Sequence, residues 1–207
     1  MIDDPQTTPE DAKPTRLIDA RSLRGLAHPL RVRLLELLKL DGPATSTGLS
    51  ERLGENTGTV SWHLRHLAEH GFIEEETGRG TKRERWWRVV NQPSVLNTVD
   101  FRDNPETQGA LSVYLHELVN QQFNRVINYI GEDWADEWRN VGTLSAWSDL
   151  RMTPAQLKAL NEELTAVVER HLPAPGAESD PDAEPDPDAL PIIVQLQSFP
   201  RKERDTR

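Results

Sequence analysis

The sequence contains no cysteine among its 207 residues. Disulfide bonds, thiolate metal sites and thiol redox sensing are therefore excluded, because each of them requires a cysteine sulfur. Apolar residues are also scarce, at 36% of the chain with a mean hydropathy of −0.65. Proline-rich acidic segments account for much of this low value, and the rest of the chain has an ordinary globular composition.

Long hydrophobic runs are absent as well. No segment approaches the roughly 18 consecutive apolar residues that a membrane span needs. The N-terminal residues MIDDPQTTPEDAKPT lack the basic start and the apolar stretch of a secretory signal. These absences predict a cytoplasmic protein without a membrane partner.

Acidic residues outnumber basic residues in the chain as a whole, but the two kinds are unevenly distributed along it. The net charge is −10, from 24 Lys/Arg and 34 Asp/Glu. Residues 16–90 hold 13 Lys/Arg against 10 Asp/Glu, a net of +3, which leaves −13 for the remainder. Because a basic patch acts over about a Debye length, on the order of 8 Å, the local charge balance is the better guide to what this region can bind.

Short helices separated by turn signals occupy residues 19–70. Asp19 can cap a helix that extends to about Ala27, and Pro29 suits the first turn of the next, which continues to about Leu40. In the following turn, Asp41-Gly42-Pro43 ends that helix. This succession predicts a mainly α-helical fold.

Two further helices follow, and the second of them carries the most informative pattern. Ser46 or Thr47 can cap the first, and Asn56 or Thr57 can cap the second. The second has an inward stripe at positions 60, 64 and 67, and Gly71 is its expected left-handed C-cap residue. The spacing of these two helices is typical of a helix-turn-helix that docks on duplex DNA.

A β-hairpin is predicted directly afterwards. Phe72 and Ile73 begin one strand, Gly78 and Gly80 provide the turn, and the chain returns as a strand over Arg85–Val90. The hairpin completes a winged-helix plan for residues 16–92, preceded by a disordered tail at residues 1–15.

The rest of the chain is predicted to form smaller regions. Residues 93–172 are expected to serve dimerisation and to offer a possible effector region. They contain one long amphipathic helix from residue 108 to about 140, a strand over Leu144–Leu150, and a helix opened by Thr153 and Pro154. An acidic proline-rich linker (173–189), a strand (190–199) and a charged tail (200–207) complete the chain.

The exposed face of the helix over residues 57–70 is the predicted DNA contact. Small hydroxyl residues let the helix start approach DNA closely, and arginine can reach guanine or phosphate. Trp62 can stack on sugars and thymine methyl groups or pack on a partner surface. His63 is expected to pack or to bind phosphate at this surface. The predicted contacts here are Thr57, Gly58, Thr59, Ser61, Trp62, His63 and Arg65.

The hairpin supplies the second group of predicted contacts. Residues 79–88 include five basic residues and one Glu, and such side chains can follow the DNA backbone into a minor groove. The predicted contacts here are Arg79, Lys82, Arg83 and Arg85. The alternative is a solvated charged loop. Trp86 and Trp87 should point to opposite faces of their strand, one of them into the core.

Other chemistry finds little support in the sequence. His66 and His70 could share one face of a helix, but no third and fourth metal ligand is indicated, so no metal and no cofactor are predicted. There is no phosphate-binding glycine loop, nucleophile elbow or HExxH pattern. The chain is therefore not predicted to be an enzyme.

Three segments, AHPLRVRLLELL, NTGTVSWHLRHLAEHGFIE and GRGTKRERWWRV, resemble the ArsR-type winged-helix regulators, in particular the larger helix-turn-helix-domain proteins of that group common in actinobacteria. The resemblance covers about residues 17–90. It implies a homodimer whose recognition helices read a pseudo-palindromic operator. Metal-sensing relatives carry cysteine pairs, or an Asp/His/Glu set on the terminal helix. This chain has no cysteine and no such set around His116, so metal sensing is not carried over.

The sequence thus predicts a homodimeric, sequence-specific transcriptional regulator that binds double-stranded DNA and is associated with the nucleoid. A small-molecule effector is left open. The alternative is a winged-helix protein-interaction module, in which Trp62, Trp86 and Trp87 form an aromatic contact surface.

Overall fold

The computed structural model describes residues 16–79, 84–92, 94–172, 186 and 188–202. The chain divides into two compact units, Lys13–Glu132 and a second that contains Asp133–Arg207. The expected tail at residues 1–15 and most of the expected linker lie outside the described residues, as does the charged tail beyond Lys202.

Four short helices open the first unit, and local cap signals set where they begin. They are α1 (Ala20–Leu26), α2 (Pro29–Leu40), α3 (Ser46–Leu53) and α4 (Thr57–Glu69). The Asp19 carboxylate accepts a hydrogen bond from the Ser22 N–H, which confirms it as the cap of α1. The cap of α3 is Thr45 rather than Ser46 or Thr47, because its hydroxyl accepts from the Gly48 N–H.

A three-stranded antiparallel sheet completes the winged-helix plan. Strands β2 (Ala44–Thr45), β3 (Ile73–Glu75) and β4 (Trp86–Val89) pair in the order β2-β4-β3. The predicted hairpin is therefore confirmed over the described residues. A separate parallel pair joins β1 (Arg16–Leu17) to β5 (Ser94–Val95).

The core of this unit lies among its helices and beneath the sheet. Apolar side chains from each of α1 to α6 and from β3 and β4 form one cluster. Its most deeply buried apolar members are Leu23, Leu26, Leu34, Leu49, Val60, Leu64, Leu67 and Ile73. One face of α4 packs against this cluster, and the opposite face of the helix lies outside the core.

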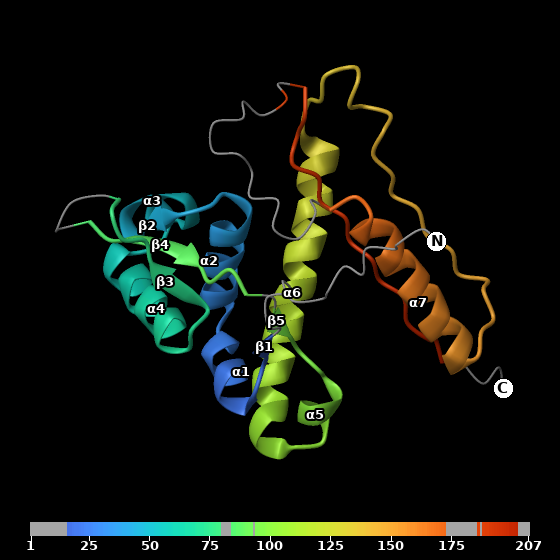
Figure 1. The fold of residues 1–207 in the computed structure, drawn as a ribbon, viewed down its shortest axis with the longest axis horizontal. Helices are drawn as coiled ribbons and strands as arrows, with labels where there is room; N and C mark the ends of the chain where they lie inside the picture. Colours follow the sequence, from blue (N-terminus) through green and yellow to red (C-terminus); the bar gives the residue numbers. More distant parts are fainter. Residues whose placement is uncertain (1–15, 80–83, 93, 173–185, 187, 203–207) are drawn as a thin grey trace, which may run out of the picture. The chain divides into compact units, whose positions relative to one another are not determined.

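A short helix, α5 (Val99–Arg102), leads into the long helix α6 (Pro105–Gly131). Figure 1 shows α1 and α2 between α4 and α6. Ion pairs join α2 to α6, with Arg33 Nε 3.4 Å from Glu117 Oε1 and Arg125 paired with Glu36. The long helix thus belongs to the same compact unit as the winged helix, whereas the sequence suggested a boundary near residue 93.

The long helix ends earlier than the expected limit near residue 140. Glu132 adopts an extended backbone (φ −81°, ψ 146°) and is the C-cap residue. Gly131 is a poor helix former, and acidic side chains at Glu132 and Asp133 interact unfavourably with the negative end of the helix dipole. Trp134 and Trp138 therefore lie beyond the helix on which the apolar spacing had placed them.

The second unit contains one helix, α7 (Pro154–Glu169), among its described residues. It begins at Pro154 with Thr153 as its cap, as predicted, and the structure adds a capping box between Thr153 and Gln156. The strands expected over 144–150 and 190–199 are wrong, because neither segment forms a ladder in the described structure. Alternating apolar residues satisfy the pattern of a strand, but a ladder also requires a partner edge at the right place.

Candidate nucleic-acid interface

Helix α4 is fixed at its start by polar side chains. The Asn56 side chain accepts a hydrogen bond of 2.8 Å from the Gly58 N–H and so caps the helix. The hydroxyls of Ser50 and Thr57 lie 2.9 Å apart and join α3 to α4. Gly54 has φ +65° and permits the tight turn between the two helices. The angle between α3 and α4 therefore has both a backbone and a side-chain constraint.

The two faces of α4 differ sharply in character. Val60, His63, Leu64 and Leu67 are buried. The opposite face is small, polar or cationic at its start, except for one tryptophan. It consists of exposed Thr57, Gly58, Thr59, Trp62 and Arg65, with Ser61 half-buried at its edge.

His63 is the predicted contact that the structure removes from this face. Its side chain is only 4% exposed, and its ring lies 4.3 Å from the ring of His28. Burial, followed by the nearby charges of His28 and other basic groups, lowers the pKa of His63 to about 4. His63 is therefore a neutral, packed residue at pH 7, which agrees with the packing alternative of the two that the sequence offered.

Trp62 and Arg65 are both braced by their own helix. Trp62 is 55% exposed, and its ring is stacked on the His66 ring at 5.4 Å with 10° between the planes. The Arg65 Nε donates to the Ser61 carbonyl at 3.1 Å, and the side chain is exposed. Such bracing reduces the rotamer entropy that either side chain would lose on contact with a ligand.

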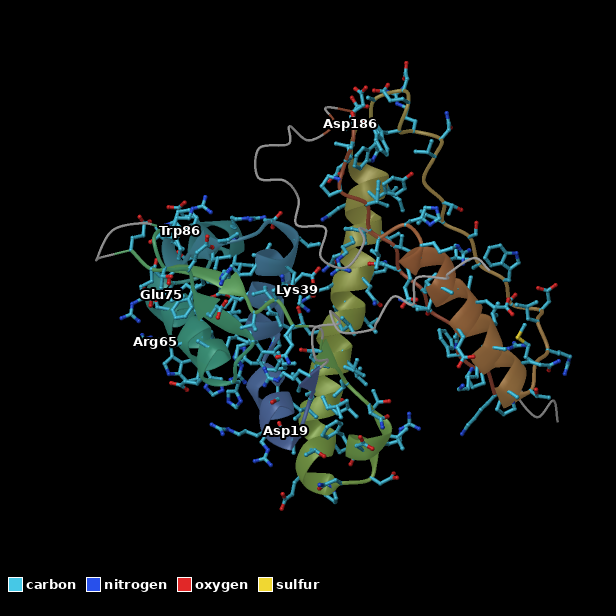
Figure 2. The ribbon with its side chains drawn as sticks, in the orientation of Figure 1. Asp19, Lys39, Arg65, Glu75, Trp86 and Asp186 are labelled. Carbon is cyan, nitrogen blue, oxygen red and sulfur yellow. The ribbon has the colours of Figure 1, made fainter. Side chains whose placement is uncertain are left out.

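The arginines of the wing, which is the hairpin of β3 and β4, already contact other side chains of the domain. The Arg79 guanidinium lies 4.2 Å from the centre of the Trp86 ring, and Arg85 Nε is 3.7 Å from a Glu75 oxygen. Figure 2 labels Arg65, Glu75 and Trp86 along one side of the unit, from α4, β3 and β4. Arg79 and Arg85 themselves are exposed. The predicted contacts Lys82 and Arg83 lie outside the described residues.

Trp87, one residue further along β4, is only 5% exposed, whereas Trp86 is half-buried beside Arg79. The expectation that one of the two tryptophans points into the core is therefore confirmed. A continuous surface of Trp62, Trp86 and Trp87 is ruled out, because the last of these belongs to the core.

Arg16 is a residue that sequence reasoning missed. Its guanidinium donates to the carbonyls of His70 (2.6 Å) and Gly71 (2.7 Å) and to the Ser22 hydroxyl (2.8 Å). It thereby satisfies carbonyl groups just beyond the end of α4. Arg16 is more than 50 residues away from His70 and Gly71 in the chain, and no local pattern connects it to them.

No group of three or more His, Cys, Asp or Glu side chains suited to a metal ion occurs in the part of the chain that the structure describes. In the same residues, no helix combines the length and the apolar character required to cross a membrane.

The element order and the exposed helix define a winged helix-turn-helix domain. Residues 26–76 match a family model described as a helix-turn-helix domain, which spans α2 to β3. No curated protein sequence matches the chain.

Several solved structures of transcriptional regulators are similar to parts of this one. A homodimeric winged helix-turn-helix DNA-binding domain from Mycobacterium bovis, described as a possible ArsR-family regulator, is 22% identical with a TM-score of 0.33, covering 50% of this chain and 78% of that one. A MarR family regulator from Neisseria meningitidis is 19% identical with a TM-score of 0.31, covering 70% and 80%. A transcriptional regulator from Thermotoga maritima is 13% identical with a TM-score of 0.31, covering 73% and 87%.

Proposed function

We propose that the chain is a sequence-specific DNA-binding transcriptional regulator in which α4 enters the major groove. The two-faced character of α4 carries this proposal. The helix is held in the core by Val60, Leu64 and Leu67, and it presents small hydroxyl residues and Arg65 outward. Small residues at a helix start allow close approach to DNA, and its N-terminal amides favour phosphate.

The wing would contribute contacts to the DNA backbone. Arg79 and Arg85 are exposed and lie beside Trp86 and Glu75, which Figure 2 labels on the same side of the unit as Arg65. A phosphate can compete for the Arg85 guanidinium, because its ion pair with Glu75 is long and exposed and therefore weak. Lys82 and Arg83, which lie outside the described residues, are proposed to act in the same way.

Two copies of the chain would bind an inverted repeat, with α6 as the dimerisation helix. Val119, Phe123, Ile127 and Ile130 follow one another along α6 at spacings of three and four residues. Each is between 48% and 63% exposed, although the spacing is that of a buried helical stripe. The same stripe from a second copy is the occupant that we propose.

The alternative, a protein-interaction module built on three tryptophans, has lost its main support because Trp87 is buried. An effector remains a prediction without an assigned site. Regulation of transcription would place the protein at the chromosome in the cytoplasm. This role requires no catalytic step.

The decisive experiment is selection of bound fragments from genomic DNA at physiological salt, followed by sequencing. Enrichment of one short inverted repeat is expected. Recovery of DNA without a shared motif would contradict sequence-specific regulation and would leave only electrostatic binding. Binding of the recovered operator should fall steeply with salt, whereas a protein-interaction module would show no such dependence on DNA.

A further inference from the structure

Four of the six histidines form one continuous group of rings behind the DNA-facing side of α4. Ring centres are 4.3 Å apart for His28 and His63, and 4.7 Å apart for His66 and His70. Trp62 joins the two pairs, with its ring 4.8 Å from His63 and 5.4 Å from His66. We call His28, His63, His66 and His70 the histidine column.

The hydrogen bonds of the column suit neutral rings. The Nδ1 atom of His28 accepts a 3.1 Å hydrogen bond from the Leu30 N–H and caps α2, which requires that this nitrogen carry no proton. The Nδ1 atoms of His63 and His70 are buried and have no hydrogen-bond partner among the described residues. A proton placed on either nitrogen would lack an acceptor, and a buried unpaired donor is costly.

Close packing leaves the column little room to adapt. A Cβ built on Gly25 of α1 would lie 2.5 Å from the Cγ atom of His70, so the ring sits directly against the backbone of α1. On the other side, Arg16 bonds to the His70 carbonyl. His70 is partly exposed, but its buried Nδ1 atom lies on the side that meets α1, so a proton on this nitrogen could reach solvent only if the contact between α1 and the end of α4 opened.

The charges that face the column are mainly positive. Arg31 of α2 is only 7% exposed, and its charge lowers the pKa of all four histidines. The charge of Arg33, also on α2, lowers the pKa of His28. From α1, Arg21 acts on His70. Two carboxylates oppose them: Glu55 in the turn before α4 faces His28, and Glu69 on α4 faces His66 at 3.6 Å and His70.

Loss of hydration is the largest influence on the pKa of every member of the column, although only His63 is fully buried, His66 and His70 are half-buried and His28 is exposed. It lowers the pKa of His28, His63, His66 and His70 below the ordinary histidine value. The two carboxylates only partly offset this effect for His28, His66 and His70. The folded column is therefore neutral at pH 7.

We propose that protonation of the histidine column releases α4 from its DNA-binding position, so that the DNA-binding face is a proton-sensitive switch. The inference rests on the proposed function and adds a regulatory signal, mild acid, to the same site. Imidazolium charges beside Arg31 would repel one another and withdraw the His28 cap. The helix that carries Trp62 and Arg65 would then lose its fixed position on α1 and α2.

The direction of this effect sets it apart from that of an ordinary histidine near DNA. An exposed histidine beside a phosphate binds DNA more tightly in acid, because protonation adds an attractive charge. The histidine column predicts the opposite, a loss of operator affinity as the pH falls. The sign of the pH dependence therefore tests the proposal.

The test measures binding of the full chain to its selected operator at pH 7.5 and pH 5.5, at constant ionic strength. We expect binding to be weaker at the lower pH, by up to about tenfold from His63 alone, since proton uptake by the released state competes with the folded arrangement. The double variant His63→Gln/His70→Gln should lose most of this pH dependence. His116→Gln, an exposed histidine of α6 outside the column, should keep all of it.

Affinity that is unchanged or increased at pH 5.5 in the wild-type protein overturns the switch while leaving DNA binding intact. So does a double variant that keeps the full pH dependence. Absence of specific binding at both pH values instead overturns the proposed function. Nuclear magnetic resonance titration of the imidazoles in the wild-type protein serves if the double variant does not fold. Column histidines that titrate at the ordinary value, with no change in the α4 amides, overturn the switch.

Discussion

At the scale of single residues, neighbours in space decide what each side chain of α4 can do. Val60, His63 and Leu67 share the buried face, so the register of the helix, and not the polarity of imidazole, places His63 in the core. Trp62, which directly precedes His63 in the sequence, is turned outward and stacks on His66. Adjacent positions on one helix thus serve opposite purposes.

Arg65→Ala should weaken operator binding by about 1–3 kcal/mol if the guanidinium reads a base. The loss on random DNA should be smaller, because a base contact contributes to specific binding only. Electrophoretic mobility shifts on both DNAs measure the difference. Arg102→Ala, an exposed arginine of α5, is the matched control and should bind as the wild type. Equal losses on the two DNAs would assign Arg65 to phosphate.

Gly25→Ala should destabilise the domain by about 1–3 kcal/mol, because the new methyl group meets the His70 ring at 2.5 Å. Gly109→Ala is the control, since a Cβ at that helical position meets nothing within 4 Å. The control should gain up to about 1 kcal/mol from helix propensity. Urea denaturation gives both values, and a neutral Gly25→Ala would show that α1 and His70 separate easily.

At the scale of elements, local chemistry set most helix starts and left the strands of the C-terminal region undetermined. Asp19, Pro29 and Thr153 mark helix starts that can be read directly from the sequence. A strand has no such internal criterion, because its hydrogen bonds belong to a neighbour that the sequence does not name. For that reason residues 190–199 matched a strand pattern and yet have no ladder.

The candidate site shows the same division. Asn56 and the outward face of α4 follow from cap chemistry and helical period, both of which are local. The pairing of Arg85 with Glu75 and the bonds from Arg16 to the end of α4 depend on tertiary placement. Sequence reasoning therefore located the helix and its exposed face but not the contacts that hold them.

Phe123→Asp should convert the proposed dimer to monomer, because it places a charge in the middle of the exposed stripe of α6. Asn124→Asp introduces the same charge at the next position, off the stripe, and should leave the dimer intact. Sedimentation velocity at micromolar concentration distinguishes the two. A wild-type monomer, or a dimer that survives Phe123→Asp, would contradict the assignment of α6.

At the scale of the whole molecule, charge is divided between a basic winged helix and acidic flanking regions. Residues 16–90 carry a net charge of +3 within a chain of −10. Within the winged helix, α4 and the hairpin carry exposed basic side chains at Arg65, Arg79 and Arg85. The total charge therefore describes the flanking regions more than the site.

Folding stability should fall as the pH drops from about 6.5 towards 4. His63 has an ordinary pKa in the unfolded chain and a pKa of about 4 when folded, so below pH 6.5 the unfolded state binds the extra proton. The loss should reach on the order of 3 kcal/mol from this residue alone. Thermal unfolding across this range tests it. His63→Gln should flatten the profile, and His171→Gln should not.

The bonds made by Arg16 have a mechanical consequence for the first unit. Its strand, β1, holds the carbonyls that follow α4 and also runs parallel to β5, which leads into α5 and α6. The far end of α4 and the entry to α6 are thus anchored to one two-residue strand. A shift of the long helix would pull on the Ile18–Val95 hydrogen bond and, through Arg16, on the end of α4. The short strand β1 thus couples the position of α6 to that of the end of α4. This coupling adds to the direct packing of both helices against α2.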